Sequence, residues 1–156
     1  LIDKNIEKIV EIGIKSIKSF GEVEITYFNG ECTFDETNRI TKLMIEKGCD
    51  VIVGFGGGKT MDTAKAAGYD AKVKIATVPT IAATCAAWAS HSAMYTPEGI
   101  AHSYYSIYKN ADLVFMDKKI TSEAPVRYII SGMVDTLAKW IETKAFTGPI
   151  KDKNVE

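Results

Sequence analysis

The sequence lacks an excess of charge of either sign. Its 156 residues include 19 lysines and arginines against 20 aspartates and glutamates, which gives a net charge of −1. A balanced chain exerts little long-range attraction on nucleic acid or on an anionic membrane, so a bound anion must be held by local groups. We therefore expect neither nucleic acid nor a membrane as a partner.

Cysteine is scarce and follows no recognisable pattern. The chain has three cysteines, Cys32, Cys49 and Cys85, with no C-x-x-C spacing. This odd number argues against a disulfide framework or a zinc cluster and favours a reducing compartment. The chain also opens on Leu1 without a basic and apolar leader. We therefore expect a cytoplasmic protein whose start is a cut rather than a natural terminus.

Charge is missing altogether between Ile75 and Pro97, a stretch long enough to span a bilayer. The stretch contains two prolines, His91 and several hydroxyl side chains, which lipid would leave without hydrogen-bond partners. We interpret it as buried protein interior. With 46% hydrophobic residues, the chain is apolar enough to form one domain of ordinary size.

Hydrophobic periodicity predicts helices that alternate with strands. The predicted helices share a three- and four-residue apolar spacing and cover 2–20, 34–47, 60–67 and 125–148. The predicted strands are short apolar or alternating runs at 23–28, 51–53, 73–78 and 112–117, with a hairpin of 92–95 and 103–107. A capping box at Thr33 and Glu36 begins the second helix. This alternation is typical of an α/β fold with a parallel sheet covered on both faces.

A glycine-rich loop joins the strand at 51–53 to the helix at 60–67. It reads Gly54-Phe55-Gly56-Gly57-Gly58-Lys59-Thr60. At such a position the free N–H groups and the dipole of a helix attract an anion, and glycine lets a phosphate approach the backbone. The alternative is a plain tight turn, which would not require three consecutive glycines and their entropic cost. We expect the loop to bind phosphate.

The spacing excludes two standard phosphate-binding motifs. A P-loop that ends in Gly58-Lys59-Thr60 would need glycine at Val53. A dinucleotide fingerprint that starts at Gly54 would need glycine at Lys59. A phosphotransferase that binds ATP through this loop is therefore disfavoured.

Three ordered motifs resemble the glycerol dehydrogenase branch of the iron-containing (group III) alcohol dehydrogenases. They are Gly56-Gly57-Gly58-Lys59-Thr60-Met61-Asp62-Thr63-Ala64-Lys65, Val78-Pro79-Thr80-Ile81-Ala82 and Gly132-Met133-Val134-Asp135-Thr136-Leu137-Ala138-Lys139-Trp140. The resemblance implies a Rossmann-like nucleotide-binding domain, then an all-helical domain, with a divalent metal (zinc or iron) and a small-molecule substrate between them. It implies an α/β domain at 1–122, without its N-terminal strand, and the first helix of a truncated helical domain at 123–156. It also implies a homo-oligomer.

The resemblance implies which residues hold NAD or NADP. The glycine loop and Asp62 would lie on the pyrophosphate, and the segment from Thr80 would line the nicotinamide side. His91 and Tyr95 match cofactor-lining positions of the family. The implied set is Asp3, Gly56, Gly57, Gly58, Lys59, Thr60, Asp62, Thr80, Ile81, Ala83, Thr84, His91 and Tyr95.

Asp3 has two interpretations. It resembles the acid that ends the first strand in NAD-preferring members, where a carboxylate accepts a hydrogen bond from the ribose and repels a 2′-phosphate. It also suits a plain N-cap for the first helix.

Asp135 stands inside the last predicted helix, beside its apolar stripe. On the residues alone, a solvated helix face is the simpler interpretation. The resemblance implies instead that Asp135 ligates the metal together with two histidines of the helical domain. Neither His91 nor His102 matches those histidines by context, so the chain supplies one ligand of three.

Cys85 marks a departure from the family pattern. Glycerol dehydrogenases carry an aspartate in this segment that meets the polyol, whereas this chain reads Ala83-Thr84-Cys85-Ala86-Ala87-Trp88. A thiol leaves a smaller, uncharged substrate pocket and resembles the hydroxycarboxylate dehydrogenases of the same family. Cys85 as a catalytic nucleophile is disfavoured because no histidine has a partner spacing. Trp88 and Trp140 are expected in the core or at a domain interface.

Together these features predict a metal-dependent NAD(P) oxidoreductase that acts on a small polyol or 2-hydroxy acid. The metal would polarise the substrate oxygen, and no side chain is assigned as a general acid or base. The alternative is a nucleotide-binding module without catalysis.

Overall fold

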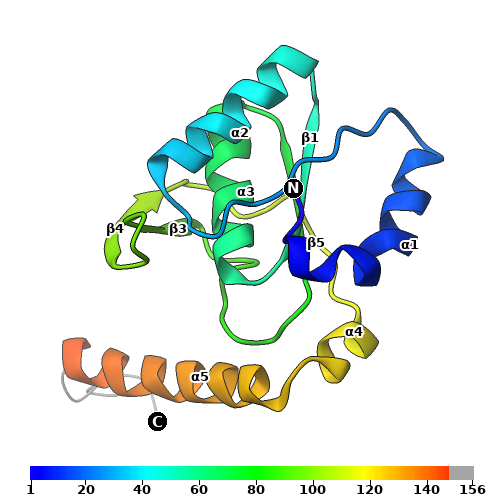
Figure 1. The fold of residues 1–156 in the computed structure, drawn as a ribbon. Helices are drawn as coiled ribbons and strands as arrows, with labels where there is room; N and C mark the ends of the chain where they lie inside the picture. Colours follow the sequence, from blue (N-terminus) through cyan, green and yellow to red (C-terminus); the bar gives the residue numbers. More distant parts are fainter. Residues whose placement is uncertain (148–156) are drawn as a thin grey trace, which may run out of the picture.

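The computed structural model describes residues 1–147. A 3₁₀ turn, η1 (Lys4–Ile6), leads into helix α1 (Glu7–Lys18), and α2 (Phe34–Lys47) follows a long connection. The central part consists of β1 (Val51–Gly56), α3 (Gly58–Asp70), β2 (Lys74–Pro79), β3 (His91–Tyr95), β4 (Ala101–Ser106) and β5 (Leu113–Val114). The short helix α4 (Lys118–Glu123) and the long helix α5 (Val126–Thr147) end the described chain (Figure 1).

The predicted parallel sheet is confirmed. Its strand order is β1-β2-β5, and β1 pairs with β2 in register from Val51 opposite Lys74 to Gly56 opposite Pro79. Strand β5 pairs with β2 only at Leu113 and Val114, so the strand predicted over 112–117 is much shorter. Strands β3 and β4 form the predicted hairpin as a separate antiparallel sheet.

Helices cover both faces of the sheet, as the apolar strands predicted. On one face, Ile52 and Ile75 pack with Ile40 and Met44 of α2 and with the alanines of α3. On the other face, Phe55 packs with Ile2 and with Val10 of α1. The alternation of Ile52 and Phe55 between the two clusters follows the two-residue period of a strand. Helix α3 lies close to the sheet because a Cβ on Gly68 would lie 2.7 Å from both isoleucines.

The strand predicted over 23–28 is wrong. Within the described residues, this segment has a single isolated bridge, between Ile2 and Tyr27, and Ile2 also bridges Phe55 of β1. Three backbone hydrogen bonds hold Ile2 and Asp3 between the two segments, with the Ile2 N–H donating to Thr26 O at 3.0 Å and the Asp3 N–H to Phe55 O at 3.1 Å. The residues before Tyr27 run beside no strand, so their β propensity has nothing to pair with.

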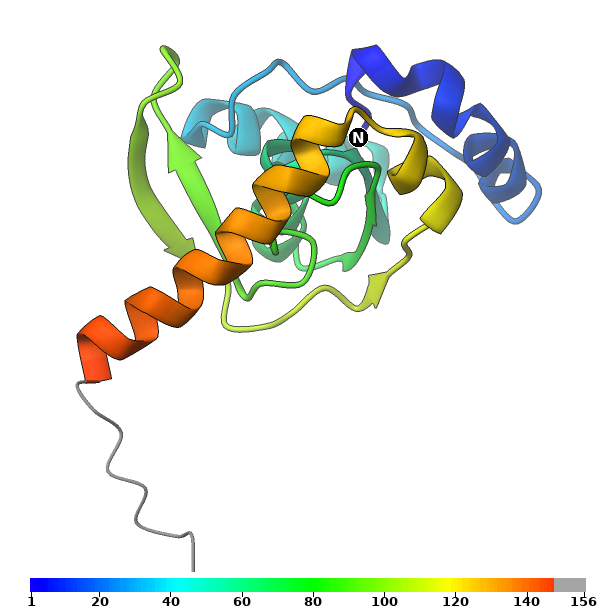
Figure 2. The same cartoon turned by 90° about the horizontal axis from the view of Figure 1, so that it is seen from below.

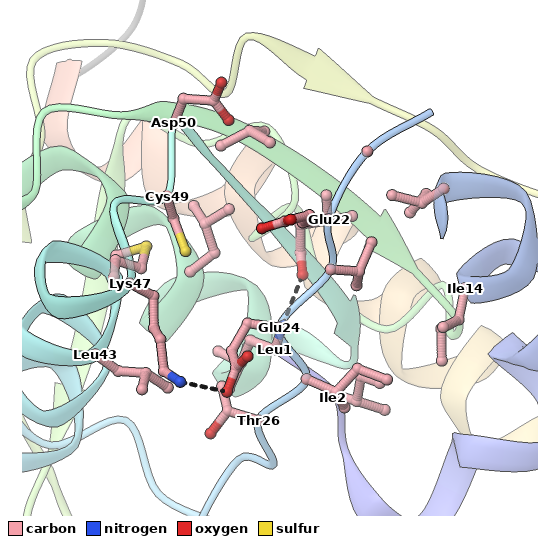
Figure 3. Close-up of a pocket in the computed structure, with 18 of the residues that line it drawn as sticks. Leu1, Ile2, Ile14, Glu22, Glu24, Thr26, Leu43, Lys47, Cys49 and Asp50 are labelled. Atoms are coloured by element: carbon pink, nitrogen blue, oxygen red, sulfur yellow. Dashed lines mark hydrogen bonds and ion pairs between the residues drawn. The ribbon is translucent and has the colours of Figure 1, made fainter. Parts of the chain in front are cut away.

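An open cavity of about 940 Å³ separates residues 22–26 from β1. Figure 3 shows Ile14 of α1, Leu43 of α2 and the acidic side chains Glu22 and Glu24 around it. Glu24 forms an ion pair with Lys47 at 3.5 Å across this cavity. None of the predicted cofactor or substrate residues lines this cavity, so we treat it as distinct from the candidate site.

Helix α5 crosses beneath the loop that follows β2 and extends beyond the sheet (Figures 1 and 2). Its apolar side chains remain exposed, among them Ile130, Leu137 and Trp140. Trp88 and Trp140 are also exposed, so they do not lie in the core of the described structure, and their place at a domain interface stays a prediction. The predicted end of this helix at Gly148, and residues 148–156 of the second predicted domain, lie outside the described residues. No helix among residues 1–147 has the length and apolarity needed to cross a bilayer.

Candidate cofactor and substrate site

The glycine loop forms a narrow cradle between the end of β1 and the start of α3. A Cβ on Gly56 would lie 2.7 Å from Thr60 Oγ1, and one on Gly58 would lie 3.1 Å from Thr84 Oγ1. Gly57 is the N-cap of α3 and offers no side chain to cap it. The first N–H groups of α3 therefore lack a side-chain partner at a place where glycine leaves the backbone accessible. This geometry fits a phosphate group.

The loop after β2 forms the second wall of the cradle. The backbone N–H of Thr80 donates to Gly56 O at 3.0 Å, which joins the ends of the two strands. The side chain of Ile81 lies over Gly57, where a Cβ would approach its Cδ1 to 3.0 Å. The structure thus brings the predicted residues of the glycine loop together with Thr80, Ile81 and Thr84, although they are about twenty positions apart in the sequence.

Lys59 faces a carboxylate that sequence reasoning missed. Its Nζ lies 2.6 Å from Oε2 and 2.7 Å from Oε1 of Glu31, and it sits 4.4 Å from the ring centroid of Tyr95. The predicted cofactor residues Lys59 and Tyr95 therefore lie together at the hairpin end of the cradle. Burial raises the pKa of the Tyr95 phenol above its ordinary value. Glu31 carries no recognisable signal in the sequence because it follows an ordinary turn pair.

Asp62 is buried and paired within the protein. Its Oδ1 lies 2.9 Å from Nζ of Lys65, and its Oδ2 accepts from the Ala93 N–H at 3.3 Å. Burial raises the pKa of Asp62, and the charge of Lys65 lowers it in part. Both carboxylate oxygens of Asp62 thus have partners within α3 and β3, and its place on the pyrophosphate stays a prediction.

Lys65 is the second residue that sequence reasoning missed. Its side chain is only 1% exposed, and its ammonium also donates to the carbonyls of Ala89 at 3.0 Å and His91 at 2.6 Å. Three acceptors thus satisfy the three donors of a buried ammonium. The pair of Asp62 and Lys65 therefore joins α3 to the start of β3 and holds in place the C-terminal end of the loop after β2, which lines the cradle.

Asp3 and His91 lie at the margins of this region. The side chain of Asp3 caps η1 by accepting from the Asn5 N–H at 2.9 Å, and its own N–H bonds to β1 next to Gly56. It therefore acts as an N-cap while lying beside the glycine loop, and its ribose role stays a prediction. The His91 ring is exposed and packs edge-on against Tyr104 at 5.4 Å.

A second cavity, of about 430 Å³, lies between the loop after β2 and α5. Cys85, Trp88 and Ala82 line it from the loop, and Asp135 and Lys139 line it from the helix. The structure thus brings together the predicted substrate residue Cys85 and the predicted metal ligand Asp135. Gly132 makes this possible, because a Cβ there would overlap the carbonyl oxygen of Ala82. The cavity adjoins the cradle at Thr84, because this residue lines the cavity and its hydroxyl also lies beside Gly58 of the cradle.

Asp135 forms an ion pair with Lys139, one helical turn further along α5. The hydrogen bond to Asp135 is the main cause that raises the pKa of the Lys139 ammonium, which also interacts with Cys85. Residues 1–147 contain no group of three His, Cys, Asp or Glu side chains that could hold a metal ion. Asp135 thus belongs to no complete metal site within residues 1–147, and the metal role that the resemblance implies for it stays a prediction.

Comparison with known proteins gives the following matches. The family model described as iron-containing alcohol dehydrogenase matches residues 1–118. A glycerol dehydrogenase of Citrobacter freundii is 47% identical over 118 residues, which cover 76% of this chain and 32% of that protein. Hydroxycarboxylate dehydrogenase A of Escherichia coli is 41% identical over 118 residues, 74% of this chain and 32% of that protein.

The fold is also shared with solved structures. The crystal structure of glycerol dehydrogenase from Schizosaccharomyces pombe superimposes with a TM-score of 0.82 at 35% identity, and the match covers 92% of this chain and 36% of that one. The chain spans about a third of the length of the curated relatives that it matches.

Proposed function

The chain belongs to the iron-containing alcohol dehydrogenase family, and we propose that it forms the cofactor-binding part of a metal-dependent NAD(P) oxidoreductase. The proposed reaction transfers hydride between a nicotinamide cofactor and a small polyol or 2-hydroxy acid. One observation carries the proposal: a single loop, residues 80–88, lines both the glycine cradle and the cavity that contains Cys85 and Asp135. A cofactor held in the cradle is thereby adjacent to a substrate held in the cavity.

Each wall has a proposed role. The cradle of Gly56, Gly57 and Gly58 holds the cofactor pyrophosphate at the N-terminus of α3, where its charge meets free N–H groups. Thr80, Ile81, Ala83 and Thr84 position the nicotinamide ring above the second cavity. The buried pair of Asp62 and Lys65 keeps α3 and β3 in place and so supports these contacts indirectly.

Asp135 is proposed as one ligand of a divalent metal, zinc or iron. The open cavity and the half-exposed carboxylate fit an oxygen ligand, and the remaining ligands are not among the described residues. A divalent ion bound there would polarise the substrate oxygen as a Lewis acid. This chain's own contribution is to orient the substrate against the apolar side chains of Ala82, Met133 and Trp88, which line the cavity. We also propose a cytoplasmic location and a homo-oligomeric state.

The test uses the full-length gene product. NADH and NADPH binding is titrated by the fluorescence of the reduced cofactor, and oxidation is followed with dihydroxyacetone and with 2-oxo acids in the presence of zinc or ferrous iron. We expect tight cofactor binding without metal and turnover only with metal. Asp135→Asn should bind cofactor normally but lose bound metal, measured by elemental analysis, and lose turnover. Cofactor binding without turnover of any carbonyl would instead support a non-catalytic nucleotide-binding module.

A further inference from the structure

The second cavity contains one cationic side chain among the residues that line it, and that side chain is Lys139. Asp135 is the one carboxylate there, and the remaining polar lining consists of Thr84, Thr136 and the thiol of Cys85. A neutral polyol is held by hydrogen bonds alone, for which the cavity offers the Asp135 carboxylate and the two threonine hydroxyls. An anionic substrate needs a cation, and Lys139 supplies one.

Lys139 is free to change partners. Its side chain is 46% exposed, and among residues 1–147 its ammonium bonds to the carboxylate and the carbonyl of Asp135 and interacts with Cys85. By contrast, the ammonium of Lys65 is 1% exposed and holds three protein acceptors. Lysine carries its charge on a flexible stem, so the ammonium of Lys139 can move from one carboxylate to another within the same cavity.

The charged groups of Asp135 and Lys139 lie side by side on α5, which suits a substrate with two neighbouring polar groups. Residues four apart on a helix project from the same face, so Asp135 and Lys139 address neighbouring points of the cavity floor. A 2-oxo acid has its carbonyl oxygen and its carboxylate on adjacent carbons. Its carbonyl can lie at Asp135, where the proposed metal would be, while its carboxylate lies at Lys139.

We propose that Lys139 binds the carboxylate of a 2-oxo acid or 2-hydroxy acid substrate and so sets the substrate class of this enzyme. The inference rests on the proposed oxidoreductase function. The reaction is R–CO–COO⁻ + NADH + H⁺ → R–CHOH–COO⁻ + NAD⁺, in which hydride forms the new C–H bond and the carbonyl oxygen takes up the proton. The charge on the substrate carboxylate is unchanged throughout, so its ion pair with Lys139 persists from substrate to product.

The experiment compares two three-carbon ketones that differ in charge, pyruvate and hydroxyacetone, in the full-length gene product. Lys139→Met should lower kcat/KM for pyruvate on the order of 10- to 100-fold, as expected for the loss of a charge-assisted hydrogen bond. It should change kcat/KM for hydroxyacetone by less than about 3-fold, and Lys139→Arg should keep most of the pyruvate activity. Lys144→Met is the matched control, because Lys144 lies on the same helix over the ring of Trp140 and not in the cavity.

A binding measurement separates this inference from the proposed function. Oxamate, a non-reacting carboxylate shaped like pyruvate, is titrated by calorimetry into the protein loaded with NADH. We expect Lys139→Met to weaken oxamate at least about 10-fold while NADH affinity stays the same. Equal losses for both ketones, or unchanged oxamate affinity, would overturn the role of Lys139. If no ketone is turned over, the proposed reaction is refuted, and the dependence of oxamate binding on Lys139 still decides whether the cavity takes carboxylates.

Discussion

Nζ of Lys65 lies 2.9 Å from Oδ1 of Asp62, and this ion pair is buried between helix α3 and the first strand of the hairpin. Asp62 and Lys65 are three residues apart on α3, so one helical face presents both charges to the same buried place. The carbonyls of Ala89 and His91 complete the hydrogen bonds of the ammonium. The pair is thus a fully satisfied polar contact that secures the segment after β2.

Breaking this pair should be costly. Lys65→Met leaves the Asp62 carboxylate buried without its cation, and we expect a loss of about 3–5 kcal/mol in the free energy of unfolding. The double variant Asp62→Asn/Lys65→Met should lose less than the sum of the two single variants, since no charge stays buried. Urea denaturation of the four proteins measures this, and simple additivity would contradict the coupling.

A methyl group added to the glycine cradle should reduce cofactor affinity more than it reduces the stability of the fold. In Gly58→Ala the new Cβ would lie 3.1 Å from Thr84 Oγ1, which a small rotation relieves, but it narrows the space between the first turn of α3 and the loop after β2, where we propose that the cofactor binds. We expect NADH affinity to fall on the order of 10-fold while the thermal midpoint changes by a few degrees. Gly21→Ala is the control, because a Cβ there meets nothing within 4 Å. Equal NADH affinity in both variants would exclude the cradle as the phosphate site.

Asp3 can be tested for its two roles at once. Asparagine keeps the acceptor that caps η1, so Asp3→Asn should leave stability within about 0.5 kcal/mol. If the carboxylate also repels a 2′-phosphate, the same variant should bind NADPH more tightly relative to NADH, on the order of 10-fold. The ratio of the two dissociation constants measures this. An unchanged ratio would leave Asp3 as an N-cap alone.

Cys32 should make stability depend on alkaline pH. Its thiol is fully buried against Met94, and burial raises its pKa to about 11. An unfolded thiol titrates near pH 8.5, so the folded protein holds this proton more tightly. The stabilisation that the protonated Cys32 thiol contributes is therefore fully present below about pH 8.5 and is lost as the pH rises to about 11. Over this range the free energy of unfolding should fall by about 2–3 kcal/mol. Cys32→Ala should lack this part of the decrease between pH 8 and pH 11 in urea denaturation, whereas identical pH profiles would contradict it.

Helix positions were predictable from the sequence where local groups decide them. Thr33 caps α2 by accepting from the Glu36 N–H at 3.1 Å, and Gly48 ends the helix in the left-handed conformation with φ of 63°. The reciprocal half of the capping box does not form, because the Glu36 carboxylate accepts from Asn29 and Arg39 instead. Helix α4 was missed, although Asp117 caps it by accepting from Lys119 N–H at 2.8 Å, a signal that the sequence does contain.

The long-range contacts of the site could not be predicted in the same way. The ion pair of Lys59 and Glu31 joins residues 28 positions apart, and it depends on how the segment before α2, which bonds to β3 at Tyr95, lies beside α3. The wrong strand before Tyr27 has the same origin, since pairing depends on a distant partner and not on β propensity. The glycine loop was predicted from its own residues and Cys85 and Asp135 from the resemblance, and the structure adds Lys139, which interacts with both Cys85 and Asp135.

The contact at Gly132 has a consequence for regulation. Since the backbone of α5 rests directly on the carbonyl of Ala82, the loop and the helix cannot slide past each other without losing this contact. A metal ion that binds Asp135 and moves α5 would therefore also move the loop residues that we propose to face the nicotinamide. By thermodynamic linkage, bound cofactor then changes metal affinity by the same factor as bound metal changes cofactor affinity. The proposed site would then bind cofactor and metal cooperatively, and Gly132 would be the residue that couples them.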